Sequence, residues 1–162
     1  MWKKVGYSTT VKPDKYDSTV LYGLEAGKYR LALKTPKDQI INVEYTRDKS
    51  KKKAAYKKSK AIHLKSDIDS IYTSTEKAAR WYKVSVSSTK KRKAVTLSKD
   101  SVGGGFKFCV YQKGKRLKTV KVTKNDKVKT VKLPKKKGAY YVKVTKLTSK
   151  TTGAYYLGTY TY

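Results

Sequence analysis

Hydrophobic and polar residues alternate along most of this chain. In residues 82–86, Tyr82, Val84 and Val86 are separated by polar side chains. The same alternation recurs in segments 29–33, 41–45, 95–97, 106–110, 120–122, 131–133 and 140–144. Alternation over several residues, rich in Val, Thr and Tyr, is typical of strands that bury one face. The chain is therefore predicted to be all-β, with many short strands forming an antiparallel β-sandwich.

Turn signals separate the predicted strands. Lys113-Gly114 and Asn125-Asp126 lie where hairpin turns are expected, and Gly103-Gly104-Gly105 interrupts two strands. Helical spacing is confined to the Lys-rich stretch of residues 51–60, where we expect at most two turns of helix.

An internal repeat becomes visible when the chain is shifted by 111 residues. The shift places Gly27 on Gly138 and Tyr29 on Tyr140, and it keeps the apolar residues of the next strand in register. A glycine at a turn can take a positive φ, and the tyrosine two residues later begins the inward face of a strand. The preserved order of turn and strand indicates a duplicated β unit.

The repeat predicts a division of the chain into two parts. Residues 52–162 are expected to form one complete β-sandwich unit, and residues 1–51 the C-terminal half of a preceding unit with the start of a linker. A single β domain over residues 1–162 is the alternative. Since a few strands cannot bury their face alone, adjacent repeats or another chain are expected to complete the N-terminal half-unit.

The composition adds a strong positive charge to this picture. The 162 residues include 41 Lys or Arg and 11 Asp or Glu, which gives a net charge of +30, and only five of the 41 are arginine. Residues 52–162 hold 30 of the basic and 5 of the acidic residues. Lysine is a hydrated point charge, whereas the planar fork of arginine suits the reading of bases. The charge therefore favours diffuse, salt-sensitive attraction to a polyanion over sequence-specific DNA recognition.

Residue types that carry catalysis or bind metals are sparse. His63 is the one histidine, and its place between two apolar residues indicates a partly exposed structural side chain. Cys109 has the strand phase of a small half-buried residue, and a single cysteine forms no intramolecular disulfide. Asp67 and Asp69 are expected to belong to a polar turn. We therefore expect no enzymatic activity, no catalytic residue, no metal site and no cofactor.

Surface recognition is the function that these features leave. The candidate ligand-binding residues are basic side chains in turns, together with aromatic and basic side chains at outward strand positions: Trp81, Lys83, Lys90, Lys91, Arg92, Lys93, Lys135, Lys136, Lys137, Tyr141 and Lys143. Aromatic platforms beside cations suit polymers with flat apolar faces and negative charge. The sequence predicts a non-enzymatic adhesion module for anionic polymers such as teichoic acids, acidic glycans or matrix. A nucleic-acid-binding protein without sequence preference and a structural spacer are the alternatives.

Four segments carry a family resemblance. Residues 79–86 read Ala-Arg-Trp-Tyr-Lys-Val-Ser-Val, and residues 133–144 read Leu-Pro-Lys-Lys-Lys-Gly-Ala-Tyr-Tyr-Val-Lys-Val. With residues 105–116 and 153–157, these segments resemble strands of bacterial pre-peptidase C-terminal domains, and the resemblance covers about residues 60–162.

The resemblance implies an extracellular or cell-surface β-sandwich of jelly-roll type, as found repeated in surface proteins of Gram-positive bacteria and attached to secreted enzymes. Members of that family are usually non-catalytic, and some relatives bind collagen and use calcium. The family has an acid before Trp-Tyr where this chain has Ala79-Arg80, which removes an oxygen ligand at that position.

Membrane and targeting signals are not expected in this chain. No apolar run approaches the roughly 18 residues of a membrane span. The basic start Met1-Trp2-Lys3-Lys4 is not followed by an apolar stretch, so we expect no signal peptide.

Overall fold

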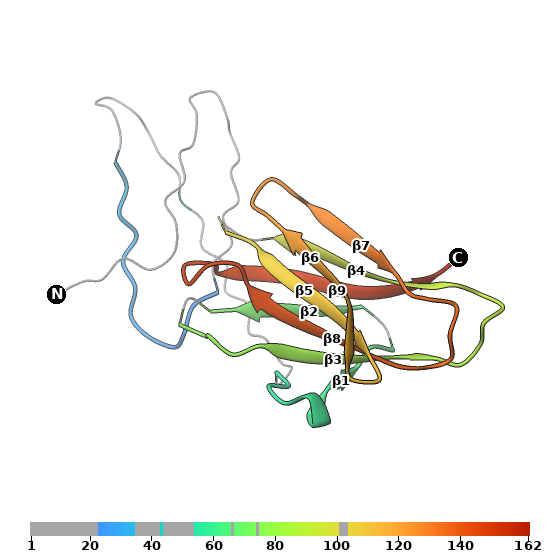
Figure 1. Cartoon of the computed structure of the whole chain (residues 1–162). Coiled ribbons are helices and arrows are strands. Elements are labelled where there is room, and N and C mark those ends of the chain that lie inside the picture. Colours follow the sequence, from blue (N-terminus) through green and yellow to red (C-terminus); the bar gives the residue numbers. More distant parts are fainter. Residues whose placement is uncertain (1–22, 35–42, 44–53, 66, 74, 101–103) are drawn as a thin grey trace.

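The computed structural model of this protein describes residues 23–34, 43, 54–65, 67–73, 75–100 and 104–162. Within them, two β-sheets pack face to face (Figure 1). The elements are η1 (Lys58–Lys60), a 3₁₀ turn, and the strands β1 (Ile62–His63), β2 (Ile68–Tyr72), β3 (Arg80–Val86), β4 (Lys93–Asp100), β5 (Phe106–Gln112), β6 (Lys115–Val122), β7 (Val128–Lys132), β8 (Gly138–Lys146) and β9 (Gly153–Thr161). The predicted all-β sandwich is confirmed.

The order of the strands is that of a jelly roll. One sheet has five strands in the order β1-β3-β8-β5-β6, and the other has four in the order β2-β9-β4-β7. From β2 onward the chain alternates between the sheets at each connection except the β5–β6 hairpin. Alternation of this kind builds two packed antiparallel sheets and is characteristic of the jelly roll. Among the described strands β1 alone pairs in parallel, with the edge of β3.

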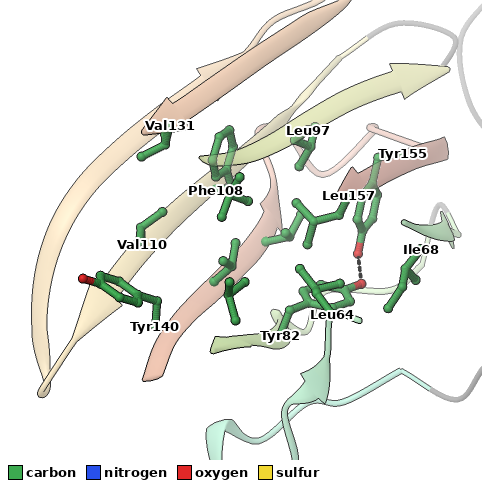
Figure 2. Close-up of a cluster of buried hydrophobic side chains, with 14 of the residues drawn as sticks. Leu64, Ile68, Tyr82, Leu97, Phe108, Val110, Val131, Tyr140, Tyr155 and Leu157 are labelled. Carbon is green, nitrogen blue, oxygen red and sulfur yellow. Dashed lines mark hydrogen bonds between the residues drawn. The ribbon is translucent and has the colours of Figure 1, made fainter. Parts of the chain in front are cut away.

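The core lies between the two sheets and is rich in aromatic side chains. Tyr72, Tyr82, Phe106 and Tyr155 have no exposed surface, and Figure 2 shows the hydroxyls of Tyr82 and Tyr155 joined by a hydrogen bond. Tyr155 lies in a closed aromatic and aliphatic environment, and this burial raises the pKa of its hydroxyl well above the ordinary value. The tyrosines that dominate the composition therefore supply a large part of the core.

The strand expected at residues 29–33 is not formed, so that prediction is wrong. The structure assigns no strand to residues 23–34, and the apolar side chains Tyr29, Leu31 and Leu33 are exposed. The alternating pattern is present, but no described backbone pairs with this segment. Residues 19–22, whose Thr-Val-Leu-Tyr sequence also predicts a strand, lie outside the described residues. The strand expected at residues 41–45 lies outside them too, apart from Val43, which is exposed and not in a strand.

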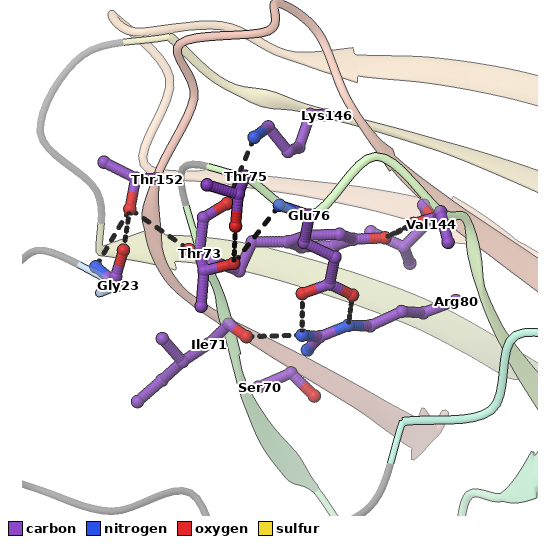
Figure 3. Close-up of polar contacts among 12 residues, drawn as sticks. Gly23, Ser70, Ile71, Thr73, Thr75, Glu76, Arg80, Val144, Lys146 and Thr152 are labelled. Carbon is purple, nitrogen blue, oxygen red and sulfur yellow. Dashed lines mark hydrogen bonds and ion pairs between the residues drawn. The ribbon is translucent and has the colours of Figure 1, made fainter. Parts of the chain in front are cut away.

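A buried threonine anchors this N-terminal segment to the sandwich. The backbone N–H of Gly23 donates to Thr152 Oγ1 at 2.9 Å, and the Thr152 hydroxyl lies 2.7 Å from the Gly23 carbonyl oxygen and 3.1 Å from that of Tyr72. Figure 3 shows this junction beside the end of β2. These hydrogen bonds attach the start of residues 23–34 to the sandwich at Thr152.

The two predicted hairpin turns have different outcomes. Lys113-Gly114 does join β5 to β6, and both residues take the positive φ (46° and 80°) that such a tight turn requires. The turn at Asn125-Asp126 is not a hairpin, because it carries the chain from β6 in one sheet to β7 in the other. It is closed by Asp126 Oδ2, which accepts hydrogen bonds from the N–H and the hydroxyl of Thr123 at 2.9 and 2.7 Å.

Within residues 54–60, the described part of the Lys-rich stretch, the expected short helical segment is present as the 3₁₀ turn η1. Over the part of the chain that the structure covers, no helix combines the length and the apolar character needed to cross a bilayer.

Candidate functional site

The outer face of the five-stranded sheet brings aromatic and basic side chains together. In the antiparallel pair β3–β8, Trp81 lies opposite Lys143 and Lys83 lies opposite Tyr141. Residues directly opposite in such a pair have Cβ atoms about 5 Å apart, so their side chains contact each other. Lys143 Nζ lies 5.5 Å from the centre of the Trp81 ring. Both predicted aromatic residues therefore have a cation next to them.

Tyr111 and Lys58 extend this surface on either side of the β3–β8 pair. Tyr111 of β5 lies opposite Tyr141, and its ring centre is 5.6 Å from that of Trp81. Lys58 Nζ lies 4.7 Å from the centre of the Tyr141 ring. We call Lys58, Trp81, Lys83, Tyr111, Tyr141 and Lys143 the aromatic–lysine face.

Sequence reasoning missed two residues of the aromatic–lysine face. The outward phase of Tyr111 is a usable signal, since it follows the strand positions of Lys107 and Cys109. Lys58 has no such signal, because it lies in the 3₁₀ turn η1, ahead of the strands. The backbone N–H of Trp81 donates to the Ala55 carbonyl at 2.8 Å. This bond holds the segment that carries Lys58 along the edge of β3.

The aromatic rings of the face are anchored but remain accessible. Trp81, Tyr111 and Tyr141 are half-buried, and partial burial raises the pKa of the Tyr111 hydroxyl, which keeps it neutral. Next to them, Cys109 is 5% exposed, with its sulfur 3.4 Å from Thr119 Oγ1. The expected packing role of Cys109 agrees with this position. The face therefore presents accessible aromatic rings and positive charges on one sheet.

The basic turns form a second group, at one end of the sandwich. Residues 90–93 follow β3 and residues 135–137 precede β8; Val86, at the end of β3, lies opposite Gly138, at the start of β8. The Leu133 N–H donates to the Lys93 carbonyl at 2.8 Å. The structure thus places Lys90, Lys91, Arg92, Lys135, Lys136 and Lys137 in neighbouring exposed turns, apart from the aromatic–lysine face.

Two side chains fix these basic turns. The Tyr140 hydroxyl donates to the Lys136 carbonyl at 2.8 Å, which orders the turn before β8. Lys93 is half-buried, and its Nζ donates to the Ser85 carbonyl at 2.9 Å. Lys93 therefore ties β4 to β3, and its ammonium group already has a protein partner.

Arg80, the basic residue before Trp-Tyr, points into the sandwich and not toward solvent. It is 7% exposed, and Figure 3 shows its guanidinium paired with Glu76. Nε donates to Glu76 Oε1 at 2.8 Å, Nη2 lies 2.6 Å from Oε2, and Nη2 also donates to the Ile71 carbonyl at 2.5 Å. Burial acts to lower the pKa of Arg80, but the hydrogen bonds and charge of Glu76 outweigh it and raise the pKa above its usual value. The carboxylate of Glu76, near the start of β3, is thus paired with the buried guanidinium of Arg80.

The residues considered for catalysis or metal binding include one on β1 and two at or next to β2, where Asp69 lies within the strand. His63 is exposed on β1, Asp67 is exposed ahead of β2, and the side chain of Asp69 is not among those described. Across the described ranges, no three or more His, Cys, Asp or Glu side chains gather as the ligands of a metal ion would.

Comparison with known proteins gives structural similarity only. No protein-family model matches this chain, and no curated protein sequence matches it. The chain is similar to the pre-peptidase C-terminal domain of collagenase from Bacillus anthracis, at 16% identity and a TM-score of 0.48, over 70% of this chain and 100% of that one. It is also similar to a family 35 carbohydrate-binding module from an environmental isolate, at 15% identity and a TM-score of 0.42, over 64% of this chain and 90% of that one.

The class of protein is defined by the strand order, which is that of a jelly-roll β-sandwich. The first of the similar structures is a domain of the kind that the sequence motifs resemble. At these identities neither similarity identifies a ligand. A proposal about the ligand therefore rests on the chemistry of the exposed faces.

Proposed function

We propose that this β-sandwich is a non-enzymatic binding module whose aromatic–lysine face holds an acidic polysaccharide. The observation that carries the proposal is the cross-strand alternation of β3 and β8, in which Trp81 faces Lys143 and Lys83 faces Tyr141. Such a surface offers a ring for the apolar face of a sugar and, beside it, a cation for the carboxylate or sulfate of that sugar.

The dimensions of the face suit a polymer better than a small molecule. Its aromatic residues come from three neighbouring strands, β3, β8 and β5, which spans about 10 Å at the usual strand spacing. The face is open, whereas small ligands are usually enclosed in a concave pocket. An extended chain can contact several of these side chains at once.

The basic turns are proposed to contribute long-range attraction. Lys90, Lys91, Arg92 and residues 135–137 are exposed at one end of the sandwich, and clustered charge of one sign raises the local concentration of an oppositely charged polymer. Because exposed charges are screened by salt, this contribution should fall as ionic strength rises.

The same proposal covers the setting of the module. The charge and the resemblance of the motifs favour a cell-surface or secreted adhesion protein, with teichoic acid, acidic glycans or matrix as anionic polymers of suitable chemistry. The exposed alternating segment with Tyr29, Leu31 and Leu33 supports the idea that an adjacent repeat or another chain completes the N-terminal part. Residues 52–162 would then be the binding unit.

The Trp81→Ala variant should bind heparin about tenfold more weakly than the parent chain, a loss of about 1.4 kcal/mol. The variant removes the central ring but leaves every lysine in place. Affinity is measured by calorimetric titration at one ionic strength, with unchanged circular dichroism as the check on folding. Tyr160→Ala, on the opposite sheet, removes an exposed ring of similar kind and should leave heparin affinity unchanged.

Three outcomes would contradict the proposal. Equal affinity of Trp81→Ala and the parent chain would remove the face from the site. Affinity for single-stranded DNA equal to that for heparin would favour nonspecific nucleic-acid binding. No binding to any polyanion would leave the spacer alternative.

A further inference from the structure

A groove lies on the outer face of the four-stranded sheet, away from the aromatic–lysine face. Its volume is about 350 Å³, and it is lined by Asp67, Thr96, Ser98, Thr130, Tyr156, Gly158, Thr159 and Tyr160. Volumes of this size accommodate small organic ligands. None of these lining residues is basic, although 41 of the 162 residues in the chain are Lys or Arg. The groove is therefore chemically unlike the rest of this surface.

Two tyrosines of β9 border the groove, with a glycine between them. Tyr156 and Tyr160 are 41% and 46% exposed, and residues 156, 158 and 160 share one face of the strand because the side chains alternate. Four steps along the strand separate the Cα atoms of the two tyrosines by about 13 Å. Gly158 puts no side chain between them, and a Cβ atom at this position would collide with the carboxylate of Asp67. The glycine thus leaves room for the Asp67 carboxylate, which lies over it.

Hydroxyl groups line the floor beside the glycine. Thr96 of β4 lies opposite both Gly158 and Thr130, and the two threonine hydroxyls are 3.1 Å apart. Ser98 lies opposite Tyr156, and among the described residues its hydroxyl has no hydrogen-bond partner. A hydroxyl both donates and accepts hydrogen bonds, whereas the Asp67 carboxylate accepts only.

We propose that this groove binds a neutral oligosaccharide, a second class of ligand beyond the acidic polymer. The tyrosine rings can stack on sugar rings, and the threonine, serine and aspartate oxygens can pair with sugar hydroxyls. An anionic sugar is disfavoured, because it would meet the Asp67 carboxylate without any cation in the lining. Since the groove and the aromatic–lysine face belong to different sheets, the two ligands can be bound together.

The test uses the full chain at a salt concentration that abolishes heparin binding. Neutral hexasaccharides of glucose, mannose, galactose and N-acetylglucosamine are titrated separately and followed by calorimetry. At least one should bind with an affinity that salt does not change, because the groove recognises it without charge. Failure of all four to bind at millimolar concentration would overturn the proposal.

Variants then locate the binding. Tyr156→Ala should weaken the bound hexasaccharide at least tenfold, and Gly158→Ala should do the same by displacing Asp67. Trp81→Ala should leave this affinity unchanged while it lowers that for heparin. If Trp81→Ala weakens binding of the neutral hexasaccharide and Tyr156→Ala does not, the groove is not the site that binds this sugar. Because Tyr156 is exposed, its replacement is not expected to impair folding. If the parent chain does not bind heparin, the proposed function is refuted, but binding of a neutral hexasaccharide in the groove would still support the present proposal.

Discussion

The Tyr155→Ala variant should lose about 4 kcal/mol of unfolding free energy, the expected cost of removing a large buried aromatic side chain. The Tyr155 ring centre lies 5.1 Å from that of Phe106 and 5.8 Å from that of Tyr72, in the middle of the space between the sheets. Alanine leaves a cavity there that the strands of two hydrogen-bonded sheets cannot close. The loss is measured by urea denaturation followed by circular dichroism.

The matched control for this variant is Tyr155→Phe. It keeps the ring and removes the hydroxyl that pairs with Tyr82. Tyr82 keeps a second partner, since its hydroxyl lies 3.0 Å from Ser70 Oγ, so the expected loss is only about 1 kcal/mol. Equal losses for phenylalanine and alanine would contradict the view that packing of the ring stabilises the core.

The Glu76→Ala variant should be destabilised by about 3 kcal/mol, because it leaves a buried charge without its counter-ion. Arg80 is 7% exposed, and its guanidinium carbon lies 4.1 Å from the centre of the Tyr72 ring. The Tyr72 ring and the Ile71 carbonyl remain as partners, but neither carries a full negative charge. Denaturation in urea at neutral pH gives the free energy directly.

The double variant Glu76→Leu, Arg80→Met tests the cause of this loss. Replacing both members of a buried ion pair by apolar residues is often close to neutral, so the double variant should be more stable than Glu76→Ala. A double variant that is less stable than the single one would show that the pair itself, and not the unpaired charge, dominates. A single variant as stable as the parent would remove the ion pair from the account of stability.

Strands such as β3 and β8 were predictable because they bury one face. In β3, and from Tyr140 to Val144 in β8, every second residue is buried, and the sequence shows this as strict alternation. The pattern is ambiguous at Tyr155-Tyr156, because two identical residues stand side by side and either could face the core. The structure buries Tyr155 completely and exposes Tyr156, as the pairing of β9 with both β2 and β4 requires.

Alternation could not say which strands would find partners. Tyr29, Leu31 and Leu33 have the alternating pattern of β8, but they are exposed and lie in no strand. Alternation alone does not specify which neighbouring backbone will pair with a segment. The same limit affected Asn125-Asp126, whose residues indicate a turn but not whether that turn stays within one sheet.

The candidate site was predictable in part, for a related reason. Outward phase along the strands placed Trp81 with Lys83 and Tyr141 with Lys143. Bringing the two pairs together requires the β3–β8 register, which joins segments far apart in the sequence. Arg80 shows another limit: nothing in the sequence indicates that this charged side chain is buried, which its ion pair with Glu76 makes possible.

The central claim is that acidic polysaccharide binds on the aromatic–lysine face, and chemical-shift mapping tests it most directly. The isotope-labelled chain is titrated with a short heparin oligosaccharide, and backbone amide shifts are followed residue by residue. We predict that the largest changes occur in β3, β8 and the C-terminal end of β5, around Trp81, Tyr111 and Tyr141, with smaller changes in the basic turns. Changes confined to the basic turns, or spread evenly over all exposed lysines, would contradict the claim.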